Sequence, residues 1–283
     1  MTAHELVAKA RNLPPVSEAA LKLIGLLGRP ETANDEIVGL LRSDSLLTAR
    51  LLRACNSPAF GLDEPVTSVD QAVFLLGYKQ IHSLVLSLAF GSTLATPLPA
   101  YAIKANGLWR HALLTATATE AAVKRGLNPA VDPSIAFTVG LLHDIGKLVM
   151  AQALTRETEA AIRNHMAGEG LGSVEAEREV LGTDHAEVGS CLLYIWRLPD
   201  LIVEAAANHH RPVVQPTPRL SAIAHLANRV AHLADDEAAP RTYAFNAEEP
   251  VVQAFEFSPT DQANLIADLR NAAEKVKGLM AVV

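Results

Sequence analysis

The run "GLLHDIGKLVM", from Gly140 to Met150, places a histidine, an aspartate and a lysine among residues that are otherwise apolar. A carboxylate in such a setting must be hydrogen-bonded, paired with a charge or bound to a metal, because an isolated buried charge is costly. Adjacent His143 and Asp144 can offer a nitrogen and an oxygen to one cation. Gly140 and Gly146 flank the pair and allow a second helix or a ligand to approach closely. The alternative is a buried His–Asp hydrogen bond that holds two helices together.

Four further histidines stand in helical contexts, and each has a structural explanation as well as a metal-binding one: His111, His185, His209 and His210. His111 is followed on its face by small residues, which leave room for a ligand or for close helix packing. His185 follows a predicted N-cap and could lie on the surface of a first turn. His209 and His210 end a helix, where the helix dipole favours a cation. A single histidine of this kind is usually structural, whereas several that converge on Asp144 would form a metal site.

The chain has 283 residues, is 49% hydrophobic and carries a formal net charge of −7, which predicts a compact globular protein. This acidic balance argues against a binder of nucleic-acid polymers, because such proteins need many cations to displace counterions from phosphates. Cys55 and Cys191 lack a pairing pattern or metal-type spacing, so we expect buried thiols. The sequence shows no export signal and no uninterrupted apolar run of bilayer length. We therefore expect a cytoplasmic protein without a membrane span.

Helical periodicity is present almost throughout the chain, and it predicts an all-α fold. One helix face is marked by apolar residues at helical spacing: Ile81, Leu84, Val85, Leu88 and Ala89. Residues suited to cap helix starts are Asp44, Ser68, Asp184 and Ser258. Glycines suited to end helices are Gly77, Gly126 and Gly182.

Breaks in composition divide the chain into three parts. The proline-rich step from Thr96 to Pro99 predicts a boundary between an N-terminal helical lobe, residues 1–98, and a second helical lobe, residues 99–235. Residues 236–283 are expected to form a linker and a C-terminal helix. The apolar stripe of that helix predicts docking on the body of the protein, and the alternative is a helix that binds a partner.

The order of these residues resembles that of a known superfamily. The HD superfamily of metal-dependent phosphohydrolases has a characteristic order of residues. This chain resembles that order with His111, then His143 and Asp144, then His185, then the pair His209 and His210, and "LLHDIGK" is similar to the signature of the superfamily. Residues 41–77 and 185–212 resemble the two halves of the HDOD domain, the HD-related output domain of bacterial signalling proteins. The likeness covers most of the chain from residue 13 to about 230.

The resemblance implies an all-helical module with an N-terminal lobe and an HD-like lobe, which acts as a regulatory output in bacterial signal transduction. Most such modules have no established reaction. It implies a divalent metal, either Fe, Mn, Mg or Zn, or else a site that has lost its metal. The implied partners are signalling proteins, with a cyclic dinucleotide as a further candidate. The implied metal ligands are His111, His143, Asp144, His185, His209 and His210.

Two departures from the HD pattern weaken the case for an enzyme. The pattern ends with an aspartate ligand on a late helix, and the matching position in "HLANRVAH" is Asn228. An amide oxygen carries no charge, so we expect this degenerate position to lower metal affinity. The GYP tripeptide of the related HD-GYP proteins, which hydrolyse cyclic di-GMP, is missing after His210. Lys147 keeps the lysine of the motif, where it either meets a phosphate or forms the solvated end of an apolar helix.

Two main hypotheses remain. The first is a non-catalytic signalling module with a degenerate HD-type pocket, acting through protein partners. The second is a metal-dependent phosphohydrolase or phosphodiesterase for cyclic di-GMP or another nucleotide, in which Lys147 would be a catalytic residue that stabilises developing charge. Binding of a cyclic dinucleotide without turnover lies between them. Asn228 and the missing GYP favour the first hypothesis, and the full set of histidines keeps the second open.

Overall fold

The protein is helical wherever the structure describes it. The computed structural model describes residues 1–10, 17–26, 34–62, 64–168, 172–215, 219–235 and 249–280. These residues form sixteen α-helices and two short 3-10 helices without a strand, apart from one isolated bridge between Leu98 and Ile103. The predicted all-α fold is confirmed. The linker expected after residue 235 lies outside the described residues as far as residue 248.

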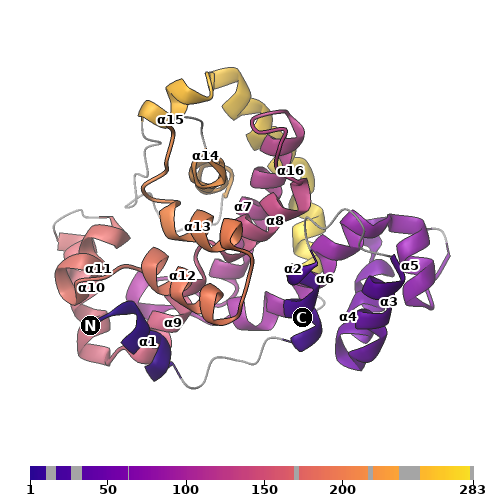
Figure 1. Ribbon diagram of the computed structural model, residues 1–283, viewed down its shortest axis with the longest axis horizontal. Helices are drawn as coiled ribbons and strands as arrows, with labels where there is room; N and C mark the ends of the chain where they lie inside the picture. The colour runs from indigo at the N-terminus through magenta and orange to yellow at the C-terminus, as the bar shows by residue number, and fades with distance from the viewer. Residues whose placement is uncertain are drawn as a thin grey trace.

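Helices from the first third of the chain build one end of the molecule, where α3, α4 and α5 gather (Figure 1). In chain order the elements here are α2 (Glu18–Gly25), α3 (Asn34–Ser43), α4 (Ser45–Cys55), η1 (Pro58–Phe60), α5 (Val69–Leu76), α6 (Tyr78–Leu94) and η2 (Pro99–Tyr101). The long helix α6 is mostly buried and contacts α2, α4 and α5 as well as α7 and α8. It therefore joins this end to the rest of the protein.

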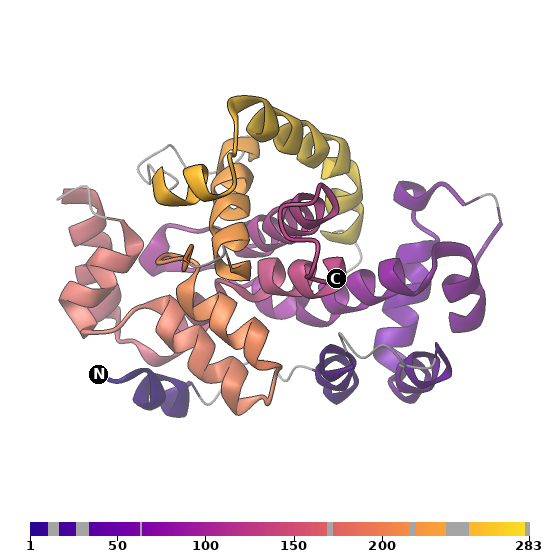
Figure 2. The same ribbon diagram turned by 45° about the horizontal axis from the view of Figure 1, so that its top comes forward.

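The helices of the central part of the chain, several of which carry candidate ligands, form the centre and the opposite end. They are α7 (Gly107–Lys124), α8 (Pro133–Leu142), α9 (Ile145–Ala153), α10 (Arg156–Gly168), α11 (Ser173–Leu181), α12 (His185–Ile195), α13 (Asp200–Asn208) and α14 (Leu220–Ala234). Helix α14 is seen end-on in Figure 1 and along its length in Figure 2, and it contacts α7, α8 and α13. The candidate site therefore lies among helices that pack directly on one another.

The helices nearest the two ends of the chain pack on this central group. Helix α1 (Ala3–Lys9) contacts α9 and α12, which belong to the predicted second lobe. After α15 (Glu249–Ala254), helix α16 (Pro259–Met280) contacts α7 and α14, and Asp268 of α16 pairs with Arg125 at 2.7 Å. The C-terminal part of α16 reaches η1, where Gly278 lies against Ala59. The predicted boundaries at residues 98 and 235 stay predictions.

The segment Pro133–Ala153, which includes α8 and α9, has the length and apolar composition of a membrane span. Most of it is buried inside the protein, with 83% of the most apolar window covered. The interior of the helical body therefore accounts for its apolar character. Cys55 is buried as predicted, whereas Cys191 is only partly buried, so the expectation of two buried thiols is wrong for the second.

A buried histidine outside the candidate site predicts a pH-dependent stability. Burial lowers the pKa of His82 on α6 to about 4, although its contact with the backbone of Leu23 and the charge of Asp132 act in the opposite direction. Because the unfolded chain binds this proton near pH 6.5, the folded state loses stability as the pH falls from 6.5 towards 4. The loss from this one group between pH 7.5 and 5 is about 2 kcal/mol.

Urea unfolding of the wild type and of His82→Leu at these two pH values measures the effect. The free energy of unfolding of His82→Leu should fall by about 2 kcal/mol less than that of the wild type. His4→Leu, at an exposed histidine of α1, is the control and should fall as much as the wild type. Equal losses in all three proteins would show that His82 is not the titrating group.

Candidate metal site

Asp144 lies at the centre of a cluster of histidine side chains. It occupies the junction between α8 and α9, directly after His143. The histidines come from α7, from this junction, from the first turn of α12 and from the end of α13. The distances from their Nε2 atoms to the nearer Asp144 oxygen are 3.2 Å for His185, 3.4 Å for His143, 3.7 Å for His209 and 3.9 Å for His111. His210 joins through its Nε2 atom, which lies 3.0 Å from that of His185.

Hydrogen bonds at the far side of three rings fix which nitrogen faces Asp144. His143 places Nδ1 at 2.7 Å from the carbonyl oxygen of Gly140, and His209 does the same with Ala206. His185 places Nδ1 at 2.7 Å from a carboxylate oxygen of Glu177. A carbonyl or carboxylate oxygen can only accept, so each Nδ1 carries a hydrogen, and each Nε2 presents a lone pair when the ring is neutral. This is the orientation that second-sphere hydrogen bonds give to metal-binding histidines.

Three of the atoms that face the centre of the cluster lack a hydrogen-bond donor among the described residues. Among the described residues, Nε2 of His143, Nε2 of His209 and Oδ1 of Asp144 are buried and have no hydrogen-bond partner. Buried polar atoms are normally satisfied, and several unsatisfied acceptors at one point require a cation or a donor between them. Two overlapping groups have donor atoms close enough to hold one ion: Asp144, His185, His209 and His210 form the first, and His111, His143 and Asp144 form the second. The residues present therefore fit a divalent metal.

Glycines allow the helices of the cluster to approach one another. A Cβ atom on Gly146 would lie 1.9 Å from the carbonyl oxygen of His185 and 2.6 Å from the nitrogen of Gly189. A Cβ atom on Gly140 would lie 2.5 Å from the Cα atom of Ala116 on α7. Both glycines predicted to permit a close approach do so, and the approaching groups are helix backbones. These contacts bring α9 against α12 and α8 against α7.

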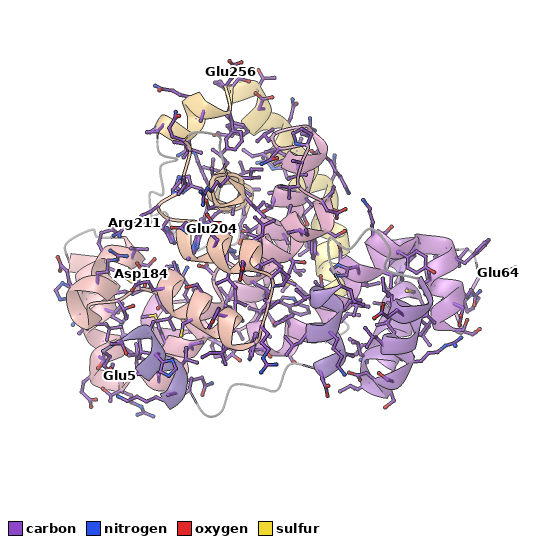
Figure 3. The ribbon with its side chains drawn as sticks, viewed as in Figure 1. Glu5, Glu64, Asp184, Glu204, Arg211 and Glu256 are labelled. Carbon is purple, nitrogen blue, oxygen red and sulfur yellow. The ribbon has the colours of Figure 1, made fainter. Side chains whose placement is uncertain are left out.

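His185 is held at the start of α12 by two carboxylates. Asp184 caps α12 by accepting a hydrogen bond from the Glu187 amide at 2.9 Å, and Arg178 donates to its other oxygen at 2.7 Å. Asp184 is labelled beside α11 and α12 in Figure 3. Glu177, on α11, accepts from both the backbone amide and the ring of His185. His185 is fully buried, so the surface alternative for this residue is wrong.

The charges in the cluster favour an ionised Asp144, and burial favours neutral rings for His111, His209 and His210. Burial acts against its ionisation, but Lys147 and His143 outweigh it and hold the pKa of Asp144 well below its usual value. The Lys147 ammonium donates to Asp144 at 2.7 Å and is mostly buried, so the alternative of a solvated lysine is wrong. Burial lowers the pKa of His209 to about 4, so the ring favours the neutral form at neutral pH over the alternative of a helix-end cation. The pKa of His111 lies well below its usual value for the same reason.

His185 and His210 differ in their charge environments. Burial opposes protonation of His185, but the carboxylate of Glu177 outweighs it and raises the pKa of His185 to about 9. Burial, with the neighbouring His209 and His185, lowers the pKa of His210 well below its usual value. A protonated His185 could itself bridge Glu177 and Asp144, which is the form that a hydrogen-bonded core would take. A metal would displace that proton, because a histidine ligand must offer a lone pair.

Sequence reasoning missed two residues of this site. Glu177 is fully buried, and its role depends on the packing of α11 beside α12, for which the sequence holds no periodic signal. The His232 ring stacks on that of His111 with ring centroids 4.3 Å apart. The sequence did contain a sign that His232 lies beside the site, because it stands one helical turn after Asn228 in "HLANRVAH". Asn228 itself is buried on α14 with its amide oxygen unpartnered among the described residues, and its part in metal binding stays a prediction.

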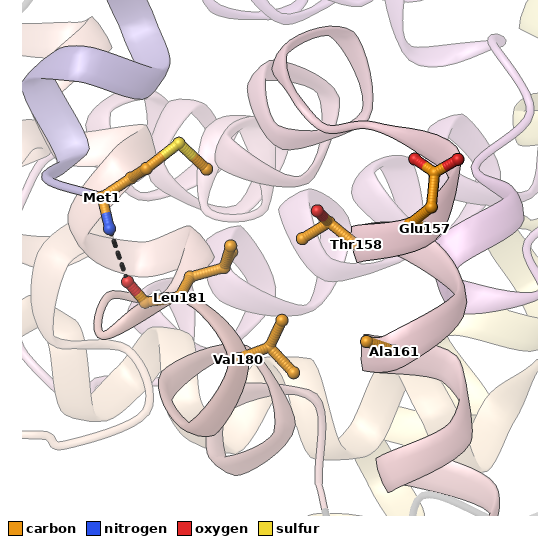
Figure 4. A pocket seen from close by; sticks show the side chains of 6 residues that line it. All are labelled: Met1, Glu157, Thr158, Ala161, Val180 and Leu181. Atoms are coloured by element: carbon orange, nitrogen blue, oxygen red, sulfur yellow. Dashed lines mark hydrogen bonds between the residues drawn. The ribbon is translucent and has the colours of Figure 1, made fainter.

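A surface pocket lies elsewhere in the protein. It is lined by Met1, Glu157, Thr158, Ala161, Val180 and Leu181, where the Met1 amino group donates to the Leu181 carbonyl oxygen at 2.8 Å (Figure 4). None of these residues belongs to the histidine cluster. The pocket therefore does not form the candidate metal site.

Comparisons with known proteins agree with this architecture. The fold is similar to that of an HDOD domain protein of unknown function from Geobacter sulfurreducens, with a TM-score of 0.74 and 24% identity over 99% of this chain and 97% of that one. It is also similar to a provisionally assigned phosphohydrolase from Shewanella amazonensis SB2B, with a TM-score of 0.71 and 22% identity over 98% and 97% of the two chains. A protein from Marinobacter aquaeolei VT8, provisionally assigned to signal transduction, gives a TM-score of 0.74 and 20% identity over 99% of this chain and 64% of that one.

The sequence comparisons identify the family. An uncharacterized protein of Treponema pallidum (strain Nichols) is 24% identical over 212 residues, which are 74% of this chain and 39% of that protein. The present chain thus spans about two fifths of the length of this relative. The family model of the HDOD domain matches residues 13–212, from before α2 to just past the end of α13, and includes the cluster from His111 to His210. The chain therefore belongs to the HDOD family.

Proposed function

We propose that this protein is a regulatory output module of bacterial signal transduction, located in the cytoplasm, whose second half is organised around a divalent metal. The observation that carries the metal is the set of buried, unpartnered acceptors formed by His143, His209 and Asp144. With His111, His185 and His210 they would hold the ion. A bound ion would supply a fixed positive charge that draws α7, α9, α12 and α13 to one point, and so couple its occupancy to the shape of the helical body.

Three features favour regulation over catalysis. The ligands His143, His185 and His209 are fully buried, so a substrate in solution has no direct contact with them in this structure. Asn228 replaces a carboxylate with a neutral amide, which reduces the negative charge available to hold a catalytic dication. The similar protein from Marinobacter aquaeolei VT8 is provisionally assigned to signal transduction, while the one from Shewanella amazonensis SB2B, provisionally assigned as a phosphohydrolase, keeps the second candidate open. We therefore propose protein partners as the targets of the output.

A partner surface is consistent with the exposed apolar side chains at the end of the molecule formed by α3, α4 and α5. Phe74 of α5 is 87% exposed and Leu46 of α4 is 62% exposed. Exposed apolar side chains that gather in one contiguous patch mark interaction surfaces, whereas single ones are normal. Phe74 and Leu46 would provide apolar contact area for another signalling protein.

The second candidate is a metal-dependent phosphohydrolase or phosphodiesterase acting on cyclic di-GMP or another nucleotide. Lys147 favours it, because its ammonium is fixed beside Asp144 and lies 5.8 Å from the centre of the Tyr101 ring. In that case the lysine would stabilise negative charge on a phosphate while the histidines and Asp144 hold the metal. Binding of a cyclic dinucleotide without hydrolysis would use the same residues.

Metal analysis and a hydrolysis assay together test the proposal. Protein purified without chelators and reloaded with Fe²⁺, Mn²⁺, Mg²⁺ or Zn²⁺ should retain a stoichiometric metal and should not hydrolyse cyclic dinucleotides, nucleotides or simple phosphodiesters. Failure to retain any of these metals would overturn the metal site in favour of a hydrogen-bonded core. Turnover that disappears in both His143→Ala and Asp144→Ala would overturn the regulatory function in favour of the enzyme.

A further inference from the structure

His232 occupies the edge of the histidine cluster between the buried ligands and solvent. It lies on α14, which packs against α7, and its ring stacks on that of His111 with an interplanar angle of 27°. Part of its side chain is exposed, unlike that of His111. The charges that act on His232 include those of Lys147 and Asp144, which places its ring within the field of the cluster. His232 therefore lies beside His111 at the edge of the cluster, although its nitrogens fall outside both groups of donor atoms that could hold one ion.

The two groups of ligands are unequal. The first group, with Asp144, His185, His209 and His210, has four members, whereas the second, with His111, His143 and Asp144, has three. The HD pattern supplies a carboxylate from the helix that is α14 here, and this chain has Asn228 at that position. Residues four apart lie on the same face of a helix, so His232 projects from α14 on the side of Asn228, one turn later.

We propose that His232 is an additional metal ligand in this protein and supplies the fourth donor of the second group, in place of the carboxylate lost at Asn228. This inference rests on the proposed metal site. Four donors are the number that a tetrahedral zinc site requires. In the structure the ring is stacked on that of His111, so metal binding by His232 requires the exposed ring to turn towards the second group.

Using His232 in place of the carboxylate lost at Asn228 would also change which metal the cluster prefers. An imidazole nitrogen replaces a carboxylate oxygen, so the described donors become six histidines and one aspartate. Imidazole suits zinc and ferrous iron, whereas carboxylate suits magnesium and manganese. We therefore expect this chain to bind Zn²⁺ or Fe²⁺ in preference to Mg²⁺.

Cobalt substitution tests the assignment without relying on an activity. Co²⁺ accepts the same nitrogen ligands as zinc, and its visible d–d absorption changes in position and intensity when a ligand is lost. The full-length protein loaded with Co²⁺ is compared with His232→Ala and with His232→Phe. The phenylalanine keeps an aromatic ring to stack on His111 but removes the nitrogen. His4→Ala, at an exposed histidine of α1, is the matched control.

If His232 is a ligand, both His232→Ala and His232→Phe should alter the cobalt spectrum and weaken Co²⁺ binding about tenfold or more, while His4→Ala leaves both unchanged. A wild-type spectrum and affinity in His232→Phe would overturn the inference and show that the ring only supports His111 by stacking. In that outcome the wild type still binds Co²⁺, so the proposed metal site survives. If the wild type itself binds no Co²⁺, the metal site fails and His232 has no metal to bind.

Discussion

Replacing Gly146 with alanine should destabilise the protein by at least about 3 kcal/mol, or prevent folding altogether. The new Cβ atom would lie 1.9 Å from the carbonyl oxygen of His185 and 2.6 Å from the amide nitrogen of Gly189. Both obstacles are backbone atoms, so no side-chain rotation can relieve the overlap and α9 would have to move away from α12. Urea unfolding followed by circular dichroism measures the loss in the free energy of unfolding.

Gly39→Ala is the matched control for this prediction. Gly39 lies within α3, is exposed, and has open space where the Cβ atom would go. Alanine is the better helix former, so this change should stabilise the protein by about 0.5–1 kcal/mol. If Gly146→Ala were as stable as Gly39→Ala, the close contact between α9 and α12 would be wrong.

Replacing Asp144 with asparagine should weaken metal binding about 100-fold or more. Asp144 belongs to both ligand groups and contributes the only carboxylate in either, so both groups lose their negative charge at once. The change keeps the size of the side chain, which separates the loss of charge from the loss of packing. Competition between the protein and a chromophoric chelator for Zn²⁺ measures the affinity.

Asp268→Asn is the control for the change at Asp144. Asp268 also pairs with a cation, Arg125, but it lies on the exposed surface of α16 and outside the cluster. It should leave the affinity for Zn²⁺ unchanged and cost little stability, because exposed ion pairs contribute about 0–1 kcal/mol. Unchanged Zn²⁺ affinity in Asp144→Asn would mean that the metal binds elsewhere. A fall in stability without any metal binding in the wild type would identify a hydrogen-bonded core.

Local features of the fold could be predicted from the sequence because their causes are local. Asp44, Ser68 and Asp184 accept hydrogen bonds from amides three residues later, as N-caps do. Gly182 adopts the left-handed conformation with φ of 79° and ends α11, which a residue with a side chain seldom does. Spacing alone does not reveal that α1 crosses to α9 and α12, because that contact depends on tertiary packing.

The candidate site could be predicted only in part, and for a related reason. Asp144 was recognisable because a carboxylate in an apolar run needs a partner wherever the chain folds. The family order then brought in residues from distant helices, and the structure places them around Asp144. Glu177 was not predictable, since a glutamate on an ordinary amphipathic helix gives no sign that it is fully buried against His185. The position of His232 one turn after Asn228 could be read from the sequence, but its place beside the cluster follows only from its stacking on His111.

The depth of the cluster sets the time for which the protein would keep a metal. Asp144 is 3% exposed and His143, His185 and His209 are fully covered, so we expect a chelator to reach a bound ion chiefly when the helices part. Release must then wait for α9 and α12 to separate, and its rate reaches a plateau as the chelator concentration rises. The plateau measures how often the helices part. We therefore expect slow metal exchange, so competition with a chelator has to be followed until it no longer changes with time.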